Sequence, residues 1–424
     1  MGIEDDMLKE VQNELKWDIK RNPKGEFVGY HANLRNARNM FLTDPNLHDS
    51  VRFNEFSGDI DLTHSFEWTK GVMTPKLFDD MDLINMRNYM AHDKIQFSKD
   101  TLLDAVCSYS MENRYNPVMD YMRSLDWDGT KRVGNWLHTY CEAEDNEYVR
   151  KIGELTLVAA CARVDKPGVK YDYMLILEGE QDVGKSQLCN ILGGQWYGEI
   201  SLHKIDKDVI AKFQGKWIVE IPELVKFSRQ DVESLKAFVS TQVDRERLSY
   251  ARLHKNMPRK CVFIGTFNPD GTPYLMDQTG NRRFHPVYVK NIDLSALQRD
   301  RDQLWAEAWC LYNCGYDLYL RENNLIKTAK EEQLKRSYYD EMTDDVDDYV
   351  NKIVLPGVRG MDIWKEVFKG SANNFDNKAQ RRIGKIMKIL GWERKLFRIG
   401  DKVNKGYTKN GNIIKNIEGI KWDE

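Results

Sequence analysis

The chain has 424 residues, of which 41% are hydrophobic and 30% charged, a composition typical of a folded globular protein with two or three domains. The longest mostly apolar run, residues 155–162, is far shorter than the roughly 20 residues of a membrane-spanning helix, so no such segment is predicted. The acidic start, MGIEDDMLKE, does not resemble a signal peptide, and we expect a cytoplasmic location. The seven cysteines form no C-x-x-C pair, which argues against zinc or disulfide frameworks and predicts reduced core thiols.

Charge is distributed unevenly along the chain. The formal net charge is −3, but residues 351–424 carry 17 Lys and Arg against eight Asp and Glu, whereas residues 1–350 carry 46 against 58. A basic C-terminal module on an acidic body favours a contact with nucleic acid.

Residues 1–150 show helical periodicity at 76–90 and 99–111 and a short extended stretch at 51–56. We expect a helical N-terminal domain there that contacts DNA or a partner. The pair Asp59 and Asp61 is interpreted as a surface turn rather than a polymerase-type metal site, because no partner carboxylate lies nearby in the sequence.

Residues 151–330 alternate short apolar strands, at 173–178, 216–221 and 260–267, with longer helical stretches. This alternation predicts an α/β layer around a largely parallel sheet. The acidic run DEMTDDVDDY is interpreted as a solvated linker or helix face, and we place an acidic linker at 331–350. Beyond it, two amphipathic helices and a glycine-punctuated tail predict a small winged-helix-like domain at 351–424.

A phosphate-binding motif lies between the strand at 173–178 and the helical stretch that follows it. The segment matches G-x-x-x-x-G-K-[ST]. Its expected nucleotide-binding residues are Gly179, Glu180, Gln181, Asp182, Val183, Gly184, Lys185, Ser186 and Gln187. The glycines let backbone N–H groups face the phosphates, Lys185 reaches the β and γ oxygens, and Ser186 holds Mg²⁺. ATP and Mg²⁺ are therefore the expected cofactors.

Hydrolysis also requires an acid at the end of a neighbouring strand. The segment KWIVEIPEL offers two. We favour Glu223 as the acid that activates water, because it follows the strand, and Glu220 as its metal-side or structural partner; the alternative is that one of them is a surface acid. Asn268, at the end of the third strand, is suited to orient the attacking water, or else forms a turn before Pro269.

Two basic segments are candidates for contacts beyond this site. Arg282 and Arg283 follow a glycine turn, and tandem arginines of this kind suggest an arginine finger supplied to a neighbouring subunit in a ring; the alternative is a pair of solvated surface arginines. Residues 243–260 alternate polar and apolar side chains, which predicts a hairpin with HKN at its tip. In a ring, Arg252, His254 and Lys255 would grip the phosphates of a threaded strand; the alternative is an idle basic surface.

The second amphipathic helix of the C-terminal domain carries basic side chains opposite its apolar face. Arg381, Arg382 and Lys385 on this helix are candidate DNA contacts, although any solvated helix has a similar pattern.

These segments together resemble one known family. The phosphate-binding motif, KWIVEIPEL, DVESLKAFVSTQVDRERLSYAR, PRKCVFIGTFN and LMDQTGNRRFHPV follow in the order of virulence-associated protein E family proteins, and NPVMDYMRSLDWDGTKRV looks like the segment that precedes them. The resemblance covers about residues 116–320. It implies an AAA+ ATPase akin to superfamily 3 helicases, found in phages and other mobile elements, that acts as a hexameric ring. Lys185, Ser186, Glu223, Asn268 and Arg283 would hold the ATPase roles.

The resemblance thus predicts a DNA helicase for the replication of a phage or mobile element, acting on single-stranded and forked DNA. Relatives often carry a primase domain in front, but this chain lacks the acid cluster of one, so a separate primase would be a partner. One alternative is a nucleotide-switched origin-binding or loader ATPase that does not translocate, and another is a metabolic P-loop kinase.

Overall fold

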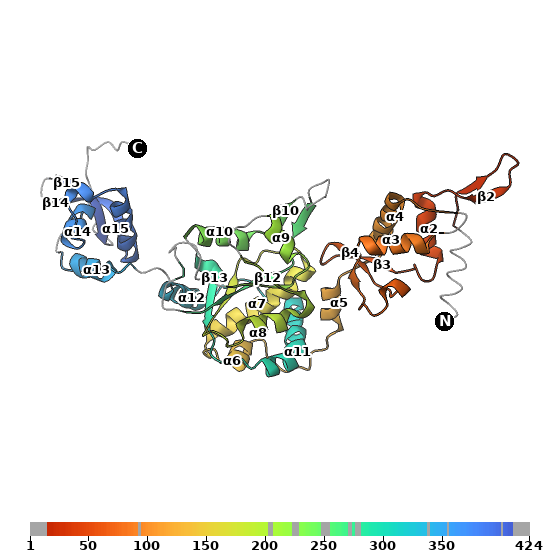
Figure 1. Cartoon of the computed structure of the whole chain (residues 1–424). Helices are drawn as coiled ribbons and strands as arrows, with labels where there is room; N and C mark the ends of the chain where they lie inside the picture. Colours follow the sequence, from red (N-terminus) through yellow and green to blue (C-terminus); the bar gives the residue numbers. More distant parts are fainter. Residues whose placement is uncertain are drawn as a thin grey trace. The chain divides into compact units, whose positions relative to one another are not determined.

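The computed structural model describes residues 15–91, 95–201, 207–222, 229–246, 255–269, 274–275, 281–336, 340–353, 356–399 and 402–409. The chain divides into two compact units, Met1–Arg336 and Ser337–Glu424 (Figure 1). Among the helices in these ranges, none combines the length and apolarity needed to span a membrane.

The first part of the larger unit combines short strands with helices. Four strands pair in the order β5-β4-β3-β6, and β1 and β2 form a separate antiparallel hairpin. Helices α2, α3 and α4 enclose a core that includes Phe41, Leu83 and Leu102. The elements are β1 (Ile19–Arg21), β2 (Phe27–Tyr30), α2 (Leu34–Thr43), β3 (Val51–Asn54), β4 (Asp59–Leu62), η1 (Glu67–Thr69), β5 (Lys76–Leu77), α3 (Asp80–Tyr89), α4 (Lys99–Glu112) and β6 (Arg114–Tyr115).

The expectation of a helical N-terminal domain is therefore corrected, because a mixed sheet organises this part. Its strands have two to four residues, too few to produce a clear alternation in the sequence. The surface-turn interpretation of Asp59 and Asp61 is also wrong, since both lie in β4. Buried Asp61 accepts hydrogen bonds from Asn54 Nδ2 at 2.8 Å and from the Tyr115 hydroxyl, and so joins β3, β4 and β6.

The second part of this unit is built on a five-stranded parallel sheet in the order β13-β7-β12-β9-β8. Helices α7, α8 and α11 pack with one face of the sheet, and α9 and α10 with the other. The elements are α5 (Pro117–Ser124), α6 (Trp136–Cys141), α7 (Glu147–Asp165), β7 (Met174–Glu178), α8 (Lys185–Gly193), η2 (Gly194–Trp196), β8 (Tyr197–Glu199), α9 (Lys207–Phe213), β9 (Ile218–Ile221), α10 (Arg229–Ser240), β10 (Val243–Glu246), β11 (Lys255–Pro258), β12 (Val262–Phe267), η4 (Asn281–Arg283), β13 (Phe284–Tyr288), α11 (Leu294–Asn313) and α12 (Asn323–Lys335).

The two faces of the sheet follow from alternation along each strand. On β7, Leu175 and Leu177 face the core shared with α7, α8 and α11, whereas Met174 and Ile176 face the core shared with α9 and α10. Because both faces are covered, the central strands β7, β9 and β12 are buried and mainly apolar, which is how buried parallel strands appear in a sequence. The α/β expectation for this region is confirmed.

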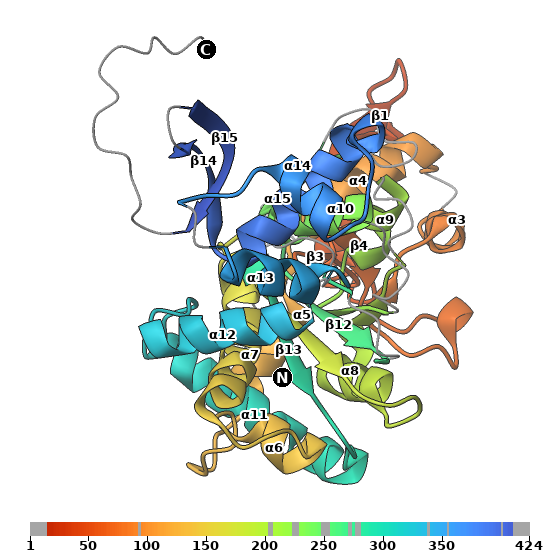
Figure 2. The ribbon, with the colours of Figure 1, turned by 90° about the vertical axis from the view of Figure 1, so that its left-hand side faces the viewer.

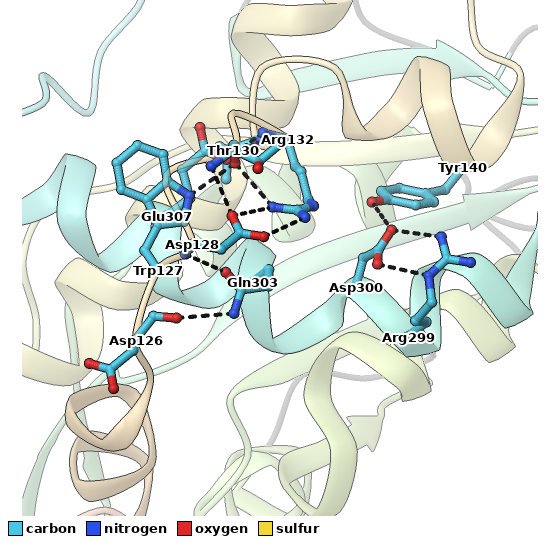
Figure 3. Close-up of polar contacts among 11 residues, drawn as sticks. Asp126, Trp127, Asp128, Thr130, Arg132, Tyr140, Arg299, Asp300, Gln303 and Glu307 are labelled. Atoms are coloured by element: carbon cyan, nitrogen blue, oxygen red, sulfur yellow. Dashed lines mark hydrogen bonds and ion pairs between the residues drawn. The ribbon is translucent and has the colours of Figure 1, made fainter.

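The loop that precedes α6 is fastened to α11 by polar contacts (Figure 3). The backbone N–H groups of Arg132 and Val133 both donate to one carboxylate oxygen of Glu307, which is buried. Gln303 accepts from the Asp128 N–H at 2.8 Å, and Arg132 forms a bidentate ion pair with Asp128 at 2.7 and 2.8 Å. That guanidinium holds the pKa of Asp128 well below its usual range.

The smaller unit consists of short helices and an antiparallel hairpin. Its elements are α13 (Thr343–Asn351), α14 (Gly360–Glu366), η5 (Ala372–Asn374), α15 (Asn377–Ile389), β14 (Trp392–Ile399) and β15 (Lys402–Lys409). A β-bridge between Val358 and Tyr407 adds a third strand position beside β15, and Figure 2 shows α14 and α15 next to each other. Residues 331–350 contain the end of α12 and most of α13, so the acidic run is a helix face, as the alternative had it, and not a linker. Val346 and Val350 are buried one helical turn apart in α13.

The cysteines only partly follow the expectation of core thiols. Cys141, Cys161, Cys189 and Cys261 are buried, but Cys107 and Cys314 are exposed and Cys310 is half-buried.

Candidate active site

The phosphate-binding motif forms a tight turn between β7 and α8. Gly184 has φ 96° and caps the N-terminus of α8, and Asp182 has φ 63°. A Cβ at Gly179 would lie 2.6 Å from the Val289 carbonyl oxygen, so only glycine fits there. The turn therefore leads directly from the carboxyl end of a buried strand to a helix N-terminus, an arrangement that binds anions.

Lys185 is held inside this turn. Its Nζ donates to the carbonyl oxygens of Gly179 at 2.8 Å and Glu180 at 2.6 Å, and the residue is 6% exposed. Burial lowers the pKa of Lys185 from its usual value. These neutral carbonyls are weaker partners for an ammonium group than an anion would be.

Glu220 lies at the centre of a set of hydroxyl donors. Its Oε1 accepts from Ser186 Oγ at 2.7 Å and Thr266 Oγ1 at 2.6 Å, and its Oε2 accepts from the Tyr197 hydroxyl at 2.6 Å. Glu220 is fully buried in β9 and forms no ion pair with a basic side chain among the residues that the structure describes. Burial and the neighbouring Glu220 carboxylate raise the pKa of Tyr197, which keeps its hydroxyl a donor.

Asn268 lies at the same edge of the sheet as the turn. The register places Phe267 beside Glu178, and the Gly179 N–H donates to the Phe267 carbonyl oxygen at 3.2 Å. Because β12 lies between β7 and β9, the exposed Asn268 follows the strand that separates the turn from Glu220. Glu223, the favoured water-activating acid, lies outside the described residues.

The root of the turn is fixed by a buried ion pair. Glu178, the last residue of β7, binds Arg336 through two contacts of 2.5 Å and accepts from the Tyr274 hydroxyl at 2.7 Å. The Glu178 and Glu332 carboxylates raise the pKa of Arg336 despite its partial burial. This pair restrains the strand end from which the phosphate-binding turn begins.

Arg282 and Arg283 lie at the end of the sheet where the parallel strands begin, opposite the phosphate-binding turn. They form η4, and the next residue, Phe284, pairs with Met174 at the start of β7. Arg283 is half-buried and donates through Nε to Ser240 Oγ, whereas Arg282 is exposed. The five residues of β7, at about 3.3 Å each, place this end of the sheet roughly 16 Å from the turn of the same chain.

The predicted hairpin is present. β10 and β11 pair antiparallel from Val243 with Pro258 to Glu246 with Lys255. Arg252 and His254 lie outside the described residues. The expectation of HKN at the tip is wrong for its last two residues, because Lys255 and Asn256 are paired in β11.

A buried ion pair anchors the base of this hairpin. The Arg259 guanidinium binds the Asp244 carboxylate at 2.7 and 2.9 Å, and both side chains are buried. Arg259 is thus a structural member of the basic run rather than a free surface cation.

In the smaller unit, Arg381 and Lys385 are exposed on α15. A groove of about 510 Å³ between α15 and the hairpin of β14 and β15 is lined by Arg381, Lys388 and Arg394. Arg382 instead forms a bidentate ion pair with Asp340 at 2.6 and 2.7 Å.

A family model described as the virulence-associated protein E-like domain matches residues 122–338. The chain belongs to this family. The matched VapE-like segment contains the five-stranded sheet, the phosphate-binding turn and Glu220, and the resemblance noted from the sequence motifs is confirmed.

This VapE-like chain also resembles solved structures. Two apo structures of the C-terminal region of NrS-1 match it: one at 12% identity and a TM-score of 0.51, covering 90% of this chain and 100% of the other, and one at 11% identity and 0.45, covering 85% and 96%. At these identities the likeness concerns the fold. No curated protein matches the chain.

Thr266 and Tyr197 are site residues that the sequence analysis missed. Thr266 lies two residues before Asn268, and its position beside Glu220 follows only from the parallel register of β12 and β9. Tyr197 begins β8, a three-residue strand with no distinct alternation. The hydroxyl at the end of an apolar strand was the available signal for Thr266.

Proposed function

We propose that this VapE-like protein hydrolyses ATP and uses the energy to move along DNA, as the helicase that supports replication of a phage or mobile element. The observation that carries this proposal is the hydrogen bond between Ser186, on the helix that follows the phosphate-binding turn, and Glu220 on β9. It brings a hydroxyl and a carboxylate together beside Lys185, a combination suited to a nucleotide triphosphate with its metal ion.

The turn fits a phosphate chain. Gly179 and Gly184 supply a backbone curvature that larger residues would not allow. Among the described residues, the hydrogen-bond partners of Lys185 Nζ are two carbonyl oxygens, which a phosphate oxygen can replace. The positive end of the α8 dipole favours the same anion.

The oxygens of Ser186 and Glu220 fit Mg²⁺, which prefers hard oxygen ligands and retains several waters. Bound there, the ion would neutralise charge on the phosphate oxygens. Thr266 and Tyr197 hold the Glu220 carboxylate in place through its other lone pairs, so Glu220 acts on the metal side and is fixed before the nucleotide arrives.

Asn268 and Glu223 complete the proposal. Asn268 follows the strand between the turn and Glu220, which suits a side chain that orients water towards the γ-phosphate. Glu223, three residues beyond Glu220, would accept the proton of that water as the bond between the β and γ phosphates breaks. An AAA+ core, with β12 between the strands of the motif and of the metal-side acid, is supported by the strand order.

ATP hydrolysis measured with and without single-stranded DNA, at low and high salt, tests this function. We expect several-fold stimulation by DNA that weakens with salt and disappears in Lys185→Ala. Turnover that is indifferent to DNA would contradict the proposal and favour a metabolic kinase or a slow nucleotide switch.

Variants in the hairpin of β10 and β11 distinguish a translocating helicase from an origin-binding or loader ATPase. We expect His254→Ala with Lys255→Ala to abolish unwinding of forked DNA and to leave duplex binding intact, because the hairpin would contact only the threaded strand. Unwinding at the wild-type rate would eliminate this role for the hairpin.

For the smaller unit we propose a winged-helix-like DNA contact. The order of α13, the Val358 bridge, α14, α15 and the β14–β15 hairpin, together with the basic groove, supports it. Arg381 and Lys385 remain the proposed contacts, whereas Arg382 is committed to Asp340 and is assigned a structural role.

A further inference from the structure

The β1–β2 ribbon, residues 16–30, carries basic and aromatic side chains on an exposed surface, apart from the β10–β11 hairpin and α15. The antiparallel strands pair Ile19 with Tyr30 and Arg21 with Phe27, and Figure 1 shows the ribbon extending beyond the helices next to it. All three residues of β1 are exposed, as are Phe27 at 40% and Val28 at 53%. A two-stranded hairpin with so little burial is marginally stable on its own, so a ligand that covers it would contribute to its stability.

The turn of the ribbon is nevertheless well defined. Asn22 Oδ1 accepts from the N–H groups of Lys24 at 2.9 Å and Glu26 at 3.0 Å, and Arg21 donates to the Gly25 carbonyl oxygen at 2.7 Å. Gly25 has φ 82°, which suits glycine in a tight turn. The exposed side chains therefore project from a backbone that is already ordered.

The acids of the ribbon form hydrogen bonds or ion pairs, whereas its lysines form no ion pair with any described residue. Asp18 accepts from Asn33 Nδ2 at 2.7 Å and pairs with Arg35 at 2.9 Å, and Glu26 accepts from Asn22 Nδ2 at 2.7 Å. Within the described ranges, no ion pair involves Lys16, Lys20 or Lys24, and all three are exposed. On a body of net negative charge, this is a local positive surface that attracts a polyanion.

Aromatic rings lie among these cations. Phe27 contacts Tyr30 edge to face at 5.1 Å, and Trp17 contacts Tyr30 at 5.3 Å. Tyr30 is thereby supported from two sides, while Phe27 presents its outer surface to solvent. Lysines that bind phosphates, interleaved with a ring that stacks on bases, are the elements of a surface for single-stranded nucleic acid.

We propose that the β1–β2 ribbon binds single-stranded DNA, with Lys20 and Lys24 on phosphates and Phe27 stacked on an unpaired base. The exposed ring favours a single strand over a duplex, because paired bases offer no free face. This contact is separate from the nucleotide site and does not require ATP.

The test measures binding of a fluorescein-labelled oligothymidine by the full chain in the Lys185→Ala background without nucleotide. Because this background lacks the proposed ATPase activity, the measured DNA binding tests the ribbon proposal independently of the proposed ATPase. We expect Lys20→Glu with Lys24→Glu to weaken binding about tenfold at low salt, and to reduce the slope of log K against log salt by about 1.4, since each single-strand phosphate contact contributes about 0.7.

The matched control is Lys70→Glu with Lys131→Glu, which makes the same change of charge at exposed lysines elsewhere in the larger unit. Its affinity and salt slope should stay close to those of the parent. Equal losses in the two double variants would overturn the proposal, because they would show a general effect of net charge.

Phe27 tests the stacking contact. We expect Phe27→Leu to weaken binding at least threefold and Phe27→Trp to preserve it, since stacking needs a ring and not only apolar surface. Hydrogen exchange of amides 19–30 shows whether each variant keeps the hairpin, and DNA should slow this exchange in the parent protein. Unchanged exchange of amides 19–30 on adding single-stranded DNA, or exchange slowed more by a duplex than by the single strand, would overturn the proposal.

Discussion

Glu220 shows how single residues define this site. Three hydroxyl groups from α8, β8 and β12 converge on one buried carboxylate, and each occupies a lone pair that burial would otherwise leave unsatisfied. Ser186 and Glu220 are recognisable from the motif and the strand end. Thr266 offers only a hydroxyl at the end of an apolar strand, and Tyr197 offers no local signal, because the roles of both depend on which strands are neighbours and in what register.

His285 is a residue whose burial should make stability depend on pH. It lies in β13 against Tyr148 and Tyr173, and neither ring nitrogen has a partner among the described residues. Burial lowers the pKa of His285 to about 3. Because the unfolded chain binds a proton near pH 6.5 and the folded chain does not, stability is fully present above pH 6.5 and is lost as pH falls towards 3.

We expect the free energy of unfolding to fall by about 2 kcal/mol between pH 7 and pH 5 through His285 alone. Urea denaturation of the wild type and His285→Phe at both pH values measures this contribution as the difference between the two proteins. Between pH 7 and pH 5, the decrease in the free energy of unfolding should be about 2 kcal/mol smaller in the variant than in the wild type. Identical pH dependence in both proteins would show that His285 is not buried in the neutral form.

At the scale of elements, α11 connects the segment before the sheet with the phosphate-binding turn. Its Glu307 accepts two backbone N–H groups from the loop before α6 (Figure 3). The side chain of Leu294, the first residue of α11, lies 3.3 Å from the position that a Cβ on Gly184 would take. The helix therefore holds the turn on one side and the loop on the other.

We expect Glu307→Ala to destabilise the protein by about 2–4 kcal/mol, because it leaves two N–H groups without their acceptor in a buried position. Glu331→Ala, on the exposed face of α12, serves as the control and should change stability by less than about 0.5 kcal/mol. Urea denaturation of both variants gives the comparison. A loss of similar size in the two would indicate that water replaces the Glu307 carboxylate.

Element prediction from the sequence succeeded where a segment is long or flanked by strong signals. Helix α4 begins with an Ser98 cap and spans 14 residues, and β7 leads into the glycine turn, so both were predictable. The strands β5, β6 and β8 have two or three residues each, and only pairing with distant segments makes them strands. The run of acids in α13 concealed Val346 and Val350, whose spacing places them on one buried face.

At the scale of the whole molecule, the phosphate-binding turn and the tandem arginines lie at opposite ends of the strands of the sheet. The phosphate-binding turn lies at the carboxyl end of β7, whereas Arg282 and Arg283 precede β13, which runs parallel to it, and so lie at the other edge. Arginines placed there do not reach the nucleotide of their own chain. If they assist hydrolysis, they act on the nucleotide of a neighbouring copy, which requires a closed ring or a stacked assembly.

We expect Arg282 to be the residue that reaches the neighbour, because it is exposed whereas Arg283 is bonded to Ser240 of its own chain. Arg282→Ala and Lys185→Ala should each lack DNA-stimulated hydrolysis. Mixed in equal amounts, they should recover about a quarter of wild-type turnover, because one random interface in four joins an intact turn to an intact arginine. Arg283→Ala by itself should lower turnover only to the extent that it destabilises the fold, because Arg283 is bonded to Ser240 of its own chain. Recovery requires that the two variants exchange subunits, which energy transfer between the two proteins labelled with different fluorophores would show. If subunits exchange and turnover does not recover, the arginine acts within its own subunit.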